Sequence, residues 1–315
     1  MKNTKLTTLL LAMAVPSAMS FGNIALTDTL AVRGFIDSSY VYVDDDRNAT
    51  EMETLDVDAF DIDFLLSQEV IDAQIQLSSI ADAGAFGVEQ AFATYKLDNG
   101  LSVTGGKYLS LLGYESDEPW KIKQKTMAYV IGNDNKIPFA AYHTGVKTNY
   151  TSDNVSATLS VVDAVYGTNS AGGSAEDLGF EAQVKFTGVE GFIFQIGTAQ
   201  DDQSAATVDK FWNFWVNYNG IDNLILGAEF NTYEFNGEDA NSWMLMGNYS
   251  FTEKADITLR YSDVDEDNLA YEADKFTVAS SYSITDNLLG RVEYSIGEAD
   301  GSDVDYFAVQ ALWTF

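Results

Sequence analysis

Apolar and polar residues alternate along most of the chain, in runs separated by turn-forming residues. The run from 71 to 78 places Ile75 and Leu77 on one side of an extended chain and Gln74 and Gln76 on the other. The same pattern recurs in the runs 60–67, 178–186, 257–261 and 288–296. A period of two over about 9–11 residues is typical of strands that face lipid on one side and water on the other. The pattern predicts an all-β protein.

The connections between these runs differ in length at the two ends of the expected strands. Tight turns such as 98–100 and 285–286 follow every second run. The connections between them are longer and acidic, and include 44–53, 171–177, 236–240, 263–272 and 298–303. Soluble β-sandwiches also alternate, but short turns at one end and longer loops at the other are typical of outer-membrane barrels. Residues 21–315 are therefore predicted to form a transmembrane antiparallel β-barrel of about sixteen strands.

The two ends of the chain carry features of an exported barrel. Residues 1–20 combine a basic start, an apolar stretch and small residues before Ser20, which predicts a signal peptide cleaved after that residue. The final alternating run, 307–315, ends in an aromatic residue. Such an ending is similar to the signal by which the barrel assembly machinery recognises its substrates. Trp313 and Phe315 are therefore the expected assembly signal.

One stretch, from Lys107 to Pro138, interrupts the alternation. Apart from Pro16, it holds all the prolines of the chain, and its lysines balance its acids, unlike the acidic remainder. A structureless connection of this length is uncommon unless it has a function. We expect residues 108–137 to be the third outer loop, folded inward to narrow the lumen; the alternative is a solvated surface loop. The candidate constriction residues are Glu115, Asp117, Glu118, Lys121, Lys123 and Lys125.

Composition and charge exclude several classes of protein. The formal net charge of −31 excludes nucleic acid as a partner, because phosphate contacts need clustered Lys and Arg. A chain that is 46% hydrophobic and 13% aromatic is not disordered. After the signal, no apolar run approaches the roughly 18 residues of a membrane helix. The absence of cysteine excludes disulfides. A membrane location must therefore come from strands.

Charged residues on the polar side of the runs are expected to face the lumen. These candidates are Arg33, Asp61, Asp63, Asp72, His143, Lys147, Glu181, Lys185, Glu229, Arg260, Arg291 and Glu293. Basic residues opposite acidic ones are similar to the transverse field of general porins, and a ladder of arginines for phosphate is missing. The excess of acid predicts a modest preference for cations.

Catalytic and metal sites are not expected. His143 is the sole histidine, and no serine or acid of a hydrolase can be placed beside it from the sequence, so it is interpreted as a polar lumen residue. The acidic run 44–46, with Glu51 and Glu53, could bind Ca²⁺ or Mg²⁺ but lacks the spacing and glycine of an EF-hand loop. The prediction is therefore a protein without a specific metal site, cofactor or enzymatic activity.

A local resemblance adds to these inferences. The segments Ala91–Leu101, Gly106-Lys107, 113–115, Pro138-Phe139 and 143–146 resemble the OmpL-like putative β-barrel porins of Gram-negative envelopes. The resemblance implies an outer-membrane barrel through which small hydrophilic solutes diffuse. Outer-membrane lipid, lipopolysaccharide and the assembly machinery are then the expected partners, with a homotrimer as a possible assembly. Two alternatives remain, namely a non-pore barrel that is adhesive or modifies lipid, and a soluble acidic β-protein.

Overall fold

The computed structural model describes residues 22–47, 50–80, 87–115, 118–132, 134–136, 142–165, 178–200, 208–235, 238–266 and 271–315. The predicted signal peptide, 1–20, and Asp117 lie outside these ranges. Within the described residues, no helix is long and apolar enough to cross a membrane.

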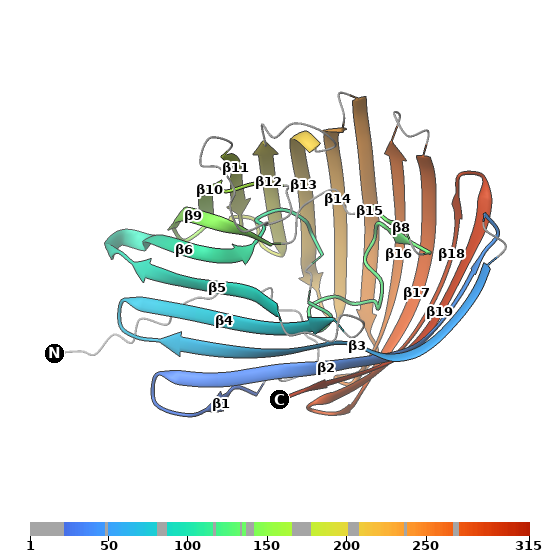
Figure 1. Cartoon of the computed structure of the whole chain (residues 1–315), viewed down its shortest axis with the longest axis horizontal. Coiled ribbons are helices and arrows are strands. Elements are labelled where there is room, and N and C mark those ends of the chain that lie inside the picture. Colours follow the sequence, from blue (N-terminus) through green and yellow to red (C-terminus); the bar gives the residue numbers. More distant parts are fainter. Residues whose placement is uncertain are drawn as a thin grey trace.

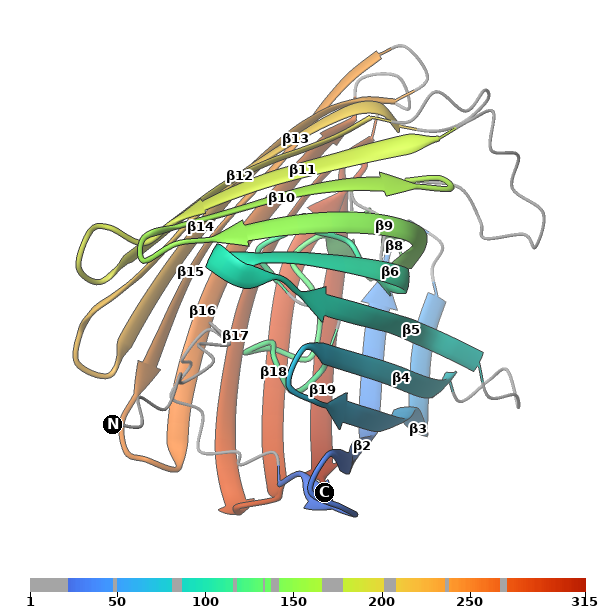
Figure 2. The same ribbon diagram turned by 90° about the vertical axis from the view of Figure 1, so that its left-hand side faces the viewer.

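Sixteen long strands among the described residues form one closed antiparallel sheet (Figure 1). They are β2 Leu30–Asp45, β3 Thr50–Ser67, β4 Ile71–Ile80, β5 Gly87–Lys96, β6 Leu101–Leu109, β9 Tyr142–Thr151, β10 Val155–Val162, β11 Gly179–Phe186, β12 Phe192–Gln200, β13 Val208–Ile221, β14 Leu224–Phe235, β15 Glu238–Ser250, β16 Ala255–Glu266, β17 Tyr271–Thr285, β18 Leu288–Ala299 and β19 Ser302–Thr314. Sequence neighbours pair, β6 pairs with β9, and β19 closes the ring on β2 (Figure 2). The predicted transmembrane antiparallel barrel of about sixteen strands is confirmed.

Four short elements complete the described structure. The strand β1, Ile24–Ala25, pairs with β2. A single 3₁₀ turn, η2 Asp98–Gly100, connects β5 to β6. The strands β7, Val130–Ile131, and β8, Asp134–Asn135, pair with each other within the connection from β6 to β9.

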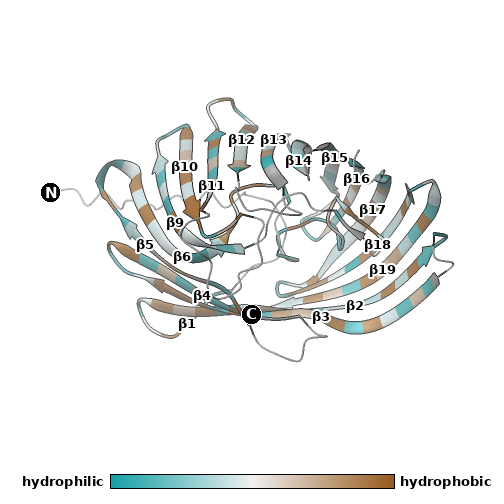
Figure 3. Ribbon diagram, turned by 45° about the horizontal axis from the view of Figure 1, so that its top comes forward, coloured by the Kyte–Doolittle hydropathy of each residue, from teal (hydrophilic) through white to brown (hydrophobic). Residues whose placement is uncertain are grey.

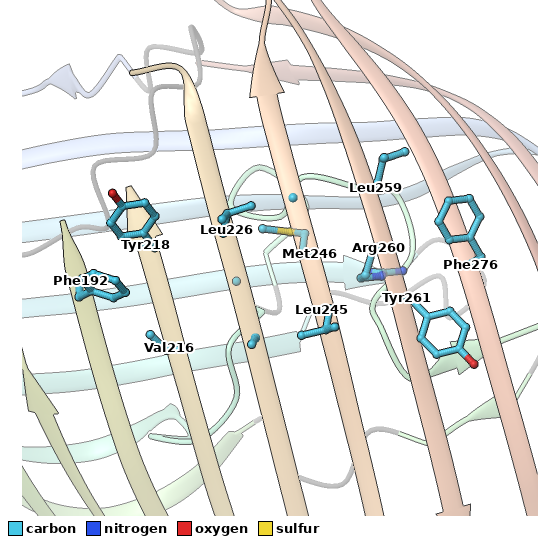
Figure 4. Close-up of a pocket in the computed structure, with 13 residues that line it drawn as sticks. Phe192, Val216, Tyr218, Leu226, Leu245, Met246, Leu259, Arg260, Tyr261 and Phe276 are labelled. Atoms are coloured by element: carbon cyan, nitrogen blue, oxygen red, sulfur yellow. The ribbon is translucent and has the colours of Figure 1, made fainter. Parts of the chain in front are cut away.

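The two faces of the sheet differ as the alternation predicts, and Figure 3 shows brown and teal alternating along the strands. On β15, Leu245 points outward and is 54% exposed, whereas its neighbour Met244 points inward and is completely buried. Large apolar side chains cover the outward face because the hydrocarbon of a bilayer cannot hydrogen-bond polar groups. Figure 4 shows a shallow apolar depression on this face, lined by β12–β17, with Phe192 and Phe276 at its sides.

Two β-bulges shift the alternation and turn an acidic residue inward. The register between β2 and β3 passes from Asp37–Ala59 to Ser38–Val57, so Asp58 is the extra residue. Between β4 and β5, the pairing skips Glu89 in the same way. Bulges re-aim side chains in this manner. Neither inward acid was expected from the alternation.

The outer connections are shorter than predicted for part of the barrel. The acidic segment 298–303 was expected to be a loop, but β18 continues to Ala299 and β19 starts at Ser302. The segment 44–53 likewise lies mostly on β2 and β3. Strands β13–β19 are 12–15 residues long, against 8–10 for β9–β12. The acidic residues of these two segments therefore lie largely on strands.

The C-terminal residue joins the first long strand. The N–H of Phe315 donates to the carbonyl of Gly34 at 3.0 Å, and the N–H of Gly34 donates back at 2.9 Å. The Trp313 ring lies on the outward face, 5.1 Å from the ring of Phe315. The predicted assembly signal thus sits at the seam where β19 meets β2, and its recognition by the assembly machinery stays a prediction.

Candidate channel constriction

Residues 110–141 connect β6 to β9, and the described part of this connection lies inside the ring of strands (Figures 1 and 2). It is the third connection at its end of the barrel, as predicted. Its bounds differ from the predicted 108–137, because Tyr108 and Leu109 still belong to β6. We call residues 110–136 the inner loop; within it the structure describes 110–115, 118–132 and 134–136.

Three inward-facing carboxylates bind the backbone of the inner loop. Glu181 on β11 accepts from the N–H of Leu111 at 3.3 Å, and Glu229 on β14 accepts from the N–H of Tyr114 at 2.6 Å. Glu293 on β18 accepts from the N–H of Lys125 at 2.5 Å. The side chains of these three acids are at most 4% exposed. Hydrogen bonds to a charged acceptor are about twice as strong as neutral ones, so these acids position the loop.

Basic side chains on the neighbouring strands bind the loop carbonyls. Arg260 on β16 donates to the carbonyl oxygens of Thr126 at 2.8 Å and Met127 at 3.2 Å. Lys275 on β17 donates to Met127 at 2.9 Å and also to Val130. Arg291 on β18 reaches the carbonyls of Ile122 and Gln124. The loop backbone, which lacks a regular sheet partner here, therefore satisfies its polar groups through the wall.

Aromatic and apolar contacts add to this polar attachment. The Tyr114 ring lies edge-on to Trp215 with the ring centroids 5.6 Å apart, and its hydroxyl donates to Asn217 at 2.8 Å. A Cβ added at Gly227 would lie 2.5 Å from Cζ of Tyr114, so glycine at this position makes room for the ring. Tyr114, Ala128, Tyr129 and Ile131 of the loop form one buried cluster with wall residues from β13 to β19.

The same loop also reaches the opposite arc of the wall, on β2–β4. Glu118 accepts a hydrogen bond of 2.6 Å from Nε2 of Gln76 on β4. The guanidinium of Arg33 on β2 lies 5.4 Å from the centre of the Trp120 ring. Lys125 pairs with Asp58 at 3.3 Å and with Asp37 at 3.6 Å. Glu115 thus contacts β16, whereas Glu118 contacts β4.

Burial shifts the ionisation of two loop residues. It raises the pKa of Glu118 to about 7; the charge of Lys121 opposes this shift, and that of Asp61 adds to it. Burial lowers the pKa of Lys123 to about 8, against an attraction from Asp256. Both groups are less charged at neutral pH than they would be in water, because a low-dielectric surrounding disfavours the ionised form.

The other predicted constriction residues differ in exposure. Glu115 is paired with Arg260, and its side chain is 6% exposed. Lys121 is exposed, with its ammonium 4.7 Å from the centre of the Trp120 ring. Lys125 is half-buried and paired, as described above. Among the described candidates, Lys121 therefore has the most access to water.

The predicted lumen-facing residues divide into two groups. Those that are buried against the loop or against each other are Asp61, Asp63, His143, Glu181, Glu229, Arg260, Arg291 and Glu293. Those that keep partial exposure are Arg33, Asp72, Lys147 and Lys185. Arg33 pairs with Asp63 at 2.6 Å and Asp72 with Lys96 at 3.0 Å. Most of these interior acids therefore contact other parts of the protein and are not exposed to water in the lumen.

Lys147 on β9 and Lys185 on β11 are the exceptions to this pairing. The ammonium of Lys147 lies 4.2 Å from the centre of the Tyr108 ring, and that of Lys185 lies 5.3 Å from the ring of Trp215. Neither forms a salt bridge among the described residues, although the carboxylate of Glu181 attracts the ammonium of Lys147. Two half-buried cations thus lie near aromatic rings on the lumen side of the wall.

His143 lies within a buried group at the start of the inner loop. Its Nε2 is 3.1 Å from Oε2 of Glu181, and the Tyr108 ring stands edge-on to it at 5.3 Å. The Tyr108 hydroxyl is hydrogen-bonded to Ser160 at 2.8 Å. His143 is 1% exposed, so solvent does not reach it. The surroundings are those of a structural residue that supports the loop.

Sequence reasoning missed several residues that hold the loop. Lys275, Asn213 and Tyr129 were not singled out, although Asn213 donates to Glu229 at 2.7 Å and Tyr129 donates to it at 2.9 Å. One available signal was the pair of aromatics Phe211 and Trp215 on the polar side of β13. Large apolar residues on a lumen face indicate that something covers them.

Among the described residues, one group of three carboxylates lies close enough together to hold a metal ion. Asp61, Glu89 and Glu118 each place one oxygen within 4.8 Å of the other two. They come from β3, from the bulge in β5 and from the inner loop. This group was not expected from the sequence, because Glu89 faces inward only through the bulge.

Comparisons with solved structures give the same fold. The chain is similar to the anion-selective porin from Comamonas acidovorans, with a TM-score of 0.71 and 12% identity over 91% of this chain and 99% of that one. It is similar to the outer membrane channel DcaP of Acinetobacter baumannii, with a TM-score of 0.68 and 13% identity over 93% and 100%. It is also similar to the trimer form of OmpT, an outer membrane protein of Vibrio cholerae, with a TM-score of 0.63 and 12% identity over 91% of this chain and 100% of that one.

A family model described as putative beta-barrel porin-2, OmpL-like, matches residues 67–310. The matched range contains the whole inner loop and the segments on which the resemblance was based. Among curated proteins, nothing matches the sequence. The barrel and the family together place the protein in the outer membrane of a Gram-negative bacterium. The chain belongs to the OmpL-like family of putative β-barrel porins.

Proposed function

We propose that the protein is a channel for passive diffusion of small hydrophilic solutes, with the inner loop as its constriction. The observation that supports this proposal is the attachment of Glu115 to Arg260 on β16 and of Glu118 to Gln76 on β4. A loop bound to both arcs of the wall divides the cross-section and leaves a narrower path. Diffusion through such a path needs neither a cofactor nor a chemical step.

Catalysis has little support in this geometry. The imidazole of the sole histidine is 1% exposed and lies beside Glu181, so a substrate in the lumen has little access to it. We propose that the interior serves passage and loop attachment only. An adhesive role would have to use the exposed outer ends of the strands, such as the acidic turn around Asp300 and Gly301.

The modest preference for cations expected from the sequence stays a prediction, and the structure suggests a reason for the opposite sign. That preference depended on interior acids such as Glu181, Glu229 and Glu293, which are buried under the loop. Lys147 and Lys185 are described lumen cations that form no salt bridge and lie beside aromatic rings. We propose that these two lysines bias the channel toward anions, because a fixed charge in a narrow low-dielectric path attracts its counter-ion.

Assembly partners remain part of the proposal. Lipid and lipopolysaccharide would surround the apolar outward face, and the assembly machinery would recognise the seam at Trp313 and Phe315. OmpT of Vibrio cholerae is described in a trimer form, and its fold is shared by this chain. A homotrimer is proposed on that likeness.

Planar-bilayer recording of the purified barrel tests the channel and its constriction together. The wild type should form discrete channels, and deletion of residues 116–135 should raise the single-channel conductance. Deletion of residues 171–176, in the connection from β10 to β11, is the matched control and should leave conductance nearly unchanged. A barrel that forms no channels would refute the proposed function. Equal conductance of the wild type and the 116–135 deletion would refute the role of the loop alone.

A further inference from the structure

We propose that Asp61, Glu89 and Glu118 form a site for a hard divalent cation of the size of Ca²⁺ that ties the inner loop to the wall. One carboxylate oxygen of each residue lies within 4.8 Å of the other two. Two oxygens bound to the same Ca²⁺ at about 2.3–2.6 Å are at most about 5 Å apart. The three oxygens are therefore close enough to share one ion, with water completing its coordination.

The three carboxylates are brought together by different parts of the fold. Asp61 faces inward on β3, the β-bulge turns Glu89 inward on β5, and the inner loop delivers Glu118. Gln76 on β4 orients two of them, since its Nε2 donates to Oδ2 of Asp61 at 2.7 Å and to Oε1 of Glu118 at 2.6 Å. Gln90 in turn donates to Oε1 of Gln76 at 2.5 Å. The site is held by a hydrogen-bonded support of the kind that orients metal ligands.

A second observation points to a ligand at this position. Asp61 is 3% exposed, and its Oδ1 has no hydrogen-bond partner among the described atoms. A buried carboxylate oxygen without a partner is costly, and a bound cation is one way to satisfy it. Glu118 is also buried, at 5% exposure. Hard divalent cations prefer oxygen ligands of this type.

Basic residues lie near the group. Arg33 pairs with Asp63 at 2.6 Å. Lys121 contributes an attraction to Glu118 from the exposed side of the loop. The group itself offers three carboxylate ligands, which is a set that suits a doubly charged ion.

The acidic hollow at the outer rim does not carry the same inference. It is lined by Asp263, Glu272, Asp274, Glu298 and Asp300. None of these has a buried oxygen without a partner among the described residues. The rim therefore serves as the internal control for weak, unselective binding of cations by surface carboxylates.

The proposed cation site does not depend on the proposed function. Only the expected effect of the bound cation on conductance rests on the protein being a channel. A cation bound by Glu118 from the loop and by Asp61 and Glu89 from the wall stabilises the state in which the loop is attached. Removal of the ion should loosen the loop at this end alone, because the attachment at Glu229 and Glu293 uses other groups.

Manganese titration tests the site. Purified barrel in detergent, freed of metal with a chelator, is titrated with Mn²⁺ and free Mn²⁺ is followed by electron paramagnetic resonance. The wild type should bind one Mn²⁺ more tightly than the rest, and Glu118→Gln should lose this site or weaken it by at least about tenfold. Asp274→Asn at the rim should retain it. Glu89→Gln, which changes the wall and leaves the loop sequence intact, should behave as Glu118→Gln does.

Equal Mn²⁺ binding by the wild type, Glu118→Gln and Glu89→Gln would overturn the proposal. The close approach of the three acids would then be explained by protons that they share and not by a metal ion. Bilayer recording of the same samples separates this result from the proposed function. Channels without the tight Mn²⁺ site would refute the cation site alone. The tight site in a barrel that forms no channels would refute the channel alone.

Discussion

Nη1 of Arg260 lies 2.6 Å from Oε1 of Glu115, and the same guanidinium donates to the carbonyl of Thr126. One wall residue thus joins two points of the inner loop that are separated along the chain. The side chain of Arg260 is completely buried, so its charge depends on these loop partners.

Replacing Arg260 by Met should release this end of the loop. Glu115 would keep a buried charge without its partner, which costs about 3–5 kcal/mol when one member of a buried pair is removed. Hydrogen exchange at residues 126–130 should become faster, and the open channel should become noisier. The double variant Arg260→Met with Glu115→Gln should recover much of the protection, because no lone charge remains. Unchanged exchange in Arg260→Met would contradict the anchoring role.

A methyl group added at position 227 of the barrel wall should displace the inner loop without any change in the loop sequence. Gly227→Ala on β14 places a Cβ 2.5 Å from Cζ of Tyr114, which must then leave its contact with Trp215. Overpacking of this kind costs about 1–3 kcal/mol. Exchange of the loop amides around Tyr114 is the measurement. Gly247→Ala is the control, because its nearest atom is Cδ2 of Leu226 at 3.5 Å; equal protection in both variants would refute the expectation.

The lumen lysines should set the sign of the selectivity. Lys147→Gln with Lys185→Gln should move the reversal potential toward cation preference, on the order of 10 mV of the about 59 mV that full selectivity gives in a tenfold salt gradient. Lys210→Gln is the control, because Lys210 is exposed on the outer face near Glu234 and is screened by salt. A double variant that keeps the wild-type reversal potential would remove these lysines from the proposed selectivity.

Stability should rise with pH through Lys123. Its pKa of about 8 in the folded protein is below the ordinary 10.5, so the unfolded chain binds more protons between these values. The free energy of unfolding therefore increases as the pH rises from about 8 to 10.5, by about 3 kcal/mol for this group. Lys123→Met should be more stable at pH 7 and should lose this component of the pH dependence.

Thermal unfolding of the wild type and Lys123→Met at pH 7 and pH 10.5 gives the comparison. Lys121→Met, which changes an exposed lysine of the same loop, should follow the wild type. A parallel pH dependence in Lys123→Met and the wild type would show that burial of Lys123 has no energetic consequence.

The barrel could be predicted from the sequence because its strands follow a local rule. The period of two in 71–78 or 288–296 identifies a strand without knowledge of its neighbours, and turns such as 285–286 separate one strand from the next. The bulges at Asp58 and Glu89 were missed, although the apolar positions change parity around each of them. After a β-bulge, the outward-facing residues change from odd to even positions or the reverse. The inward and outward faces therefore have to be assigned anew beyond the bulge.

The inner loop could be located but its contacts could not be predicted. Glu229 and Tyr114 are far apart in the sequence, and their hydrogen bond depends on where the loop crosses the lumen. Alternation indicates that Glu229 faces inward and says nothing about whether water or a loop amide will meet it. For that reason the interior acids were assigned to open water, whereas the structure buries them.

The residues that bind the inner loop lie on strands near both ends of the chain, from Asp37 on β2 to Glu293 on β18. These strands are brought together only when β19 pairs with β2. Attachment of the loop to both β2 and β18 can therefore be complete only after the ring has closed. We expect a barrel whose loop is not yet attached to be wider and more permeable than the mature one.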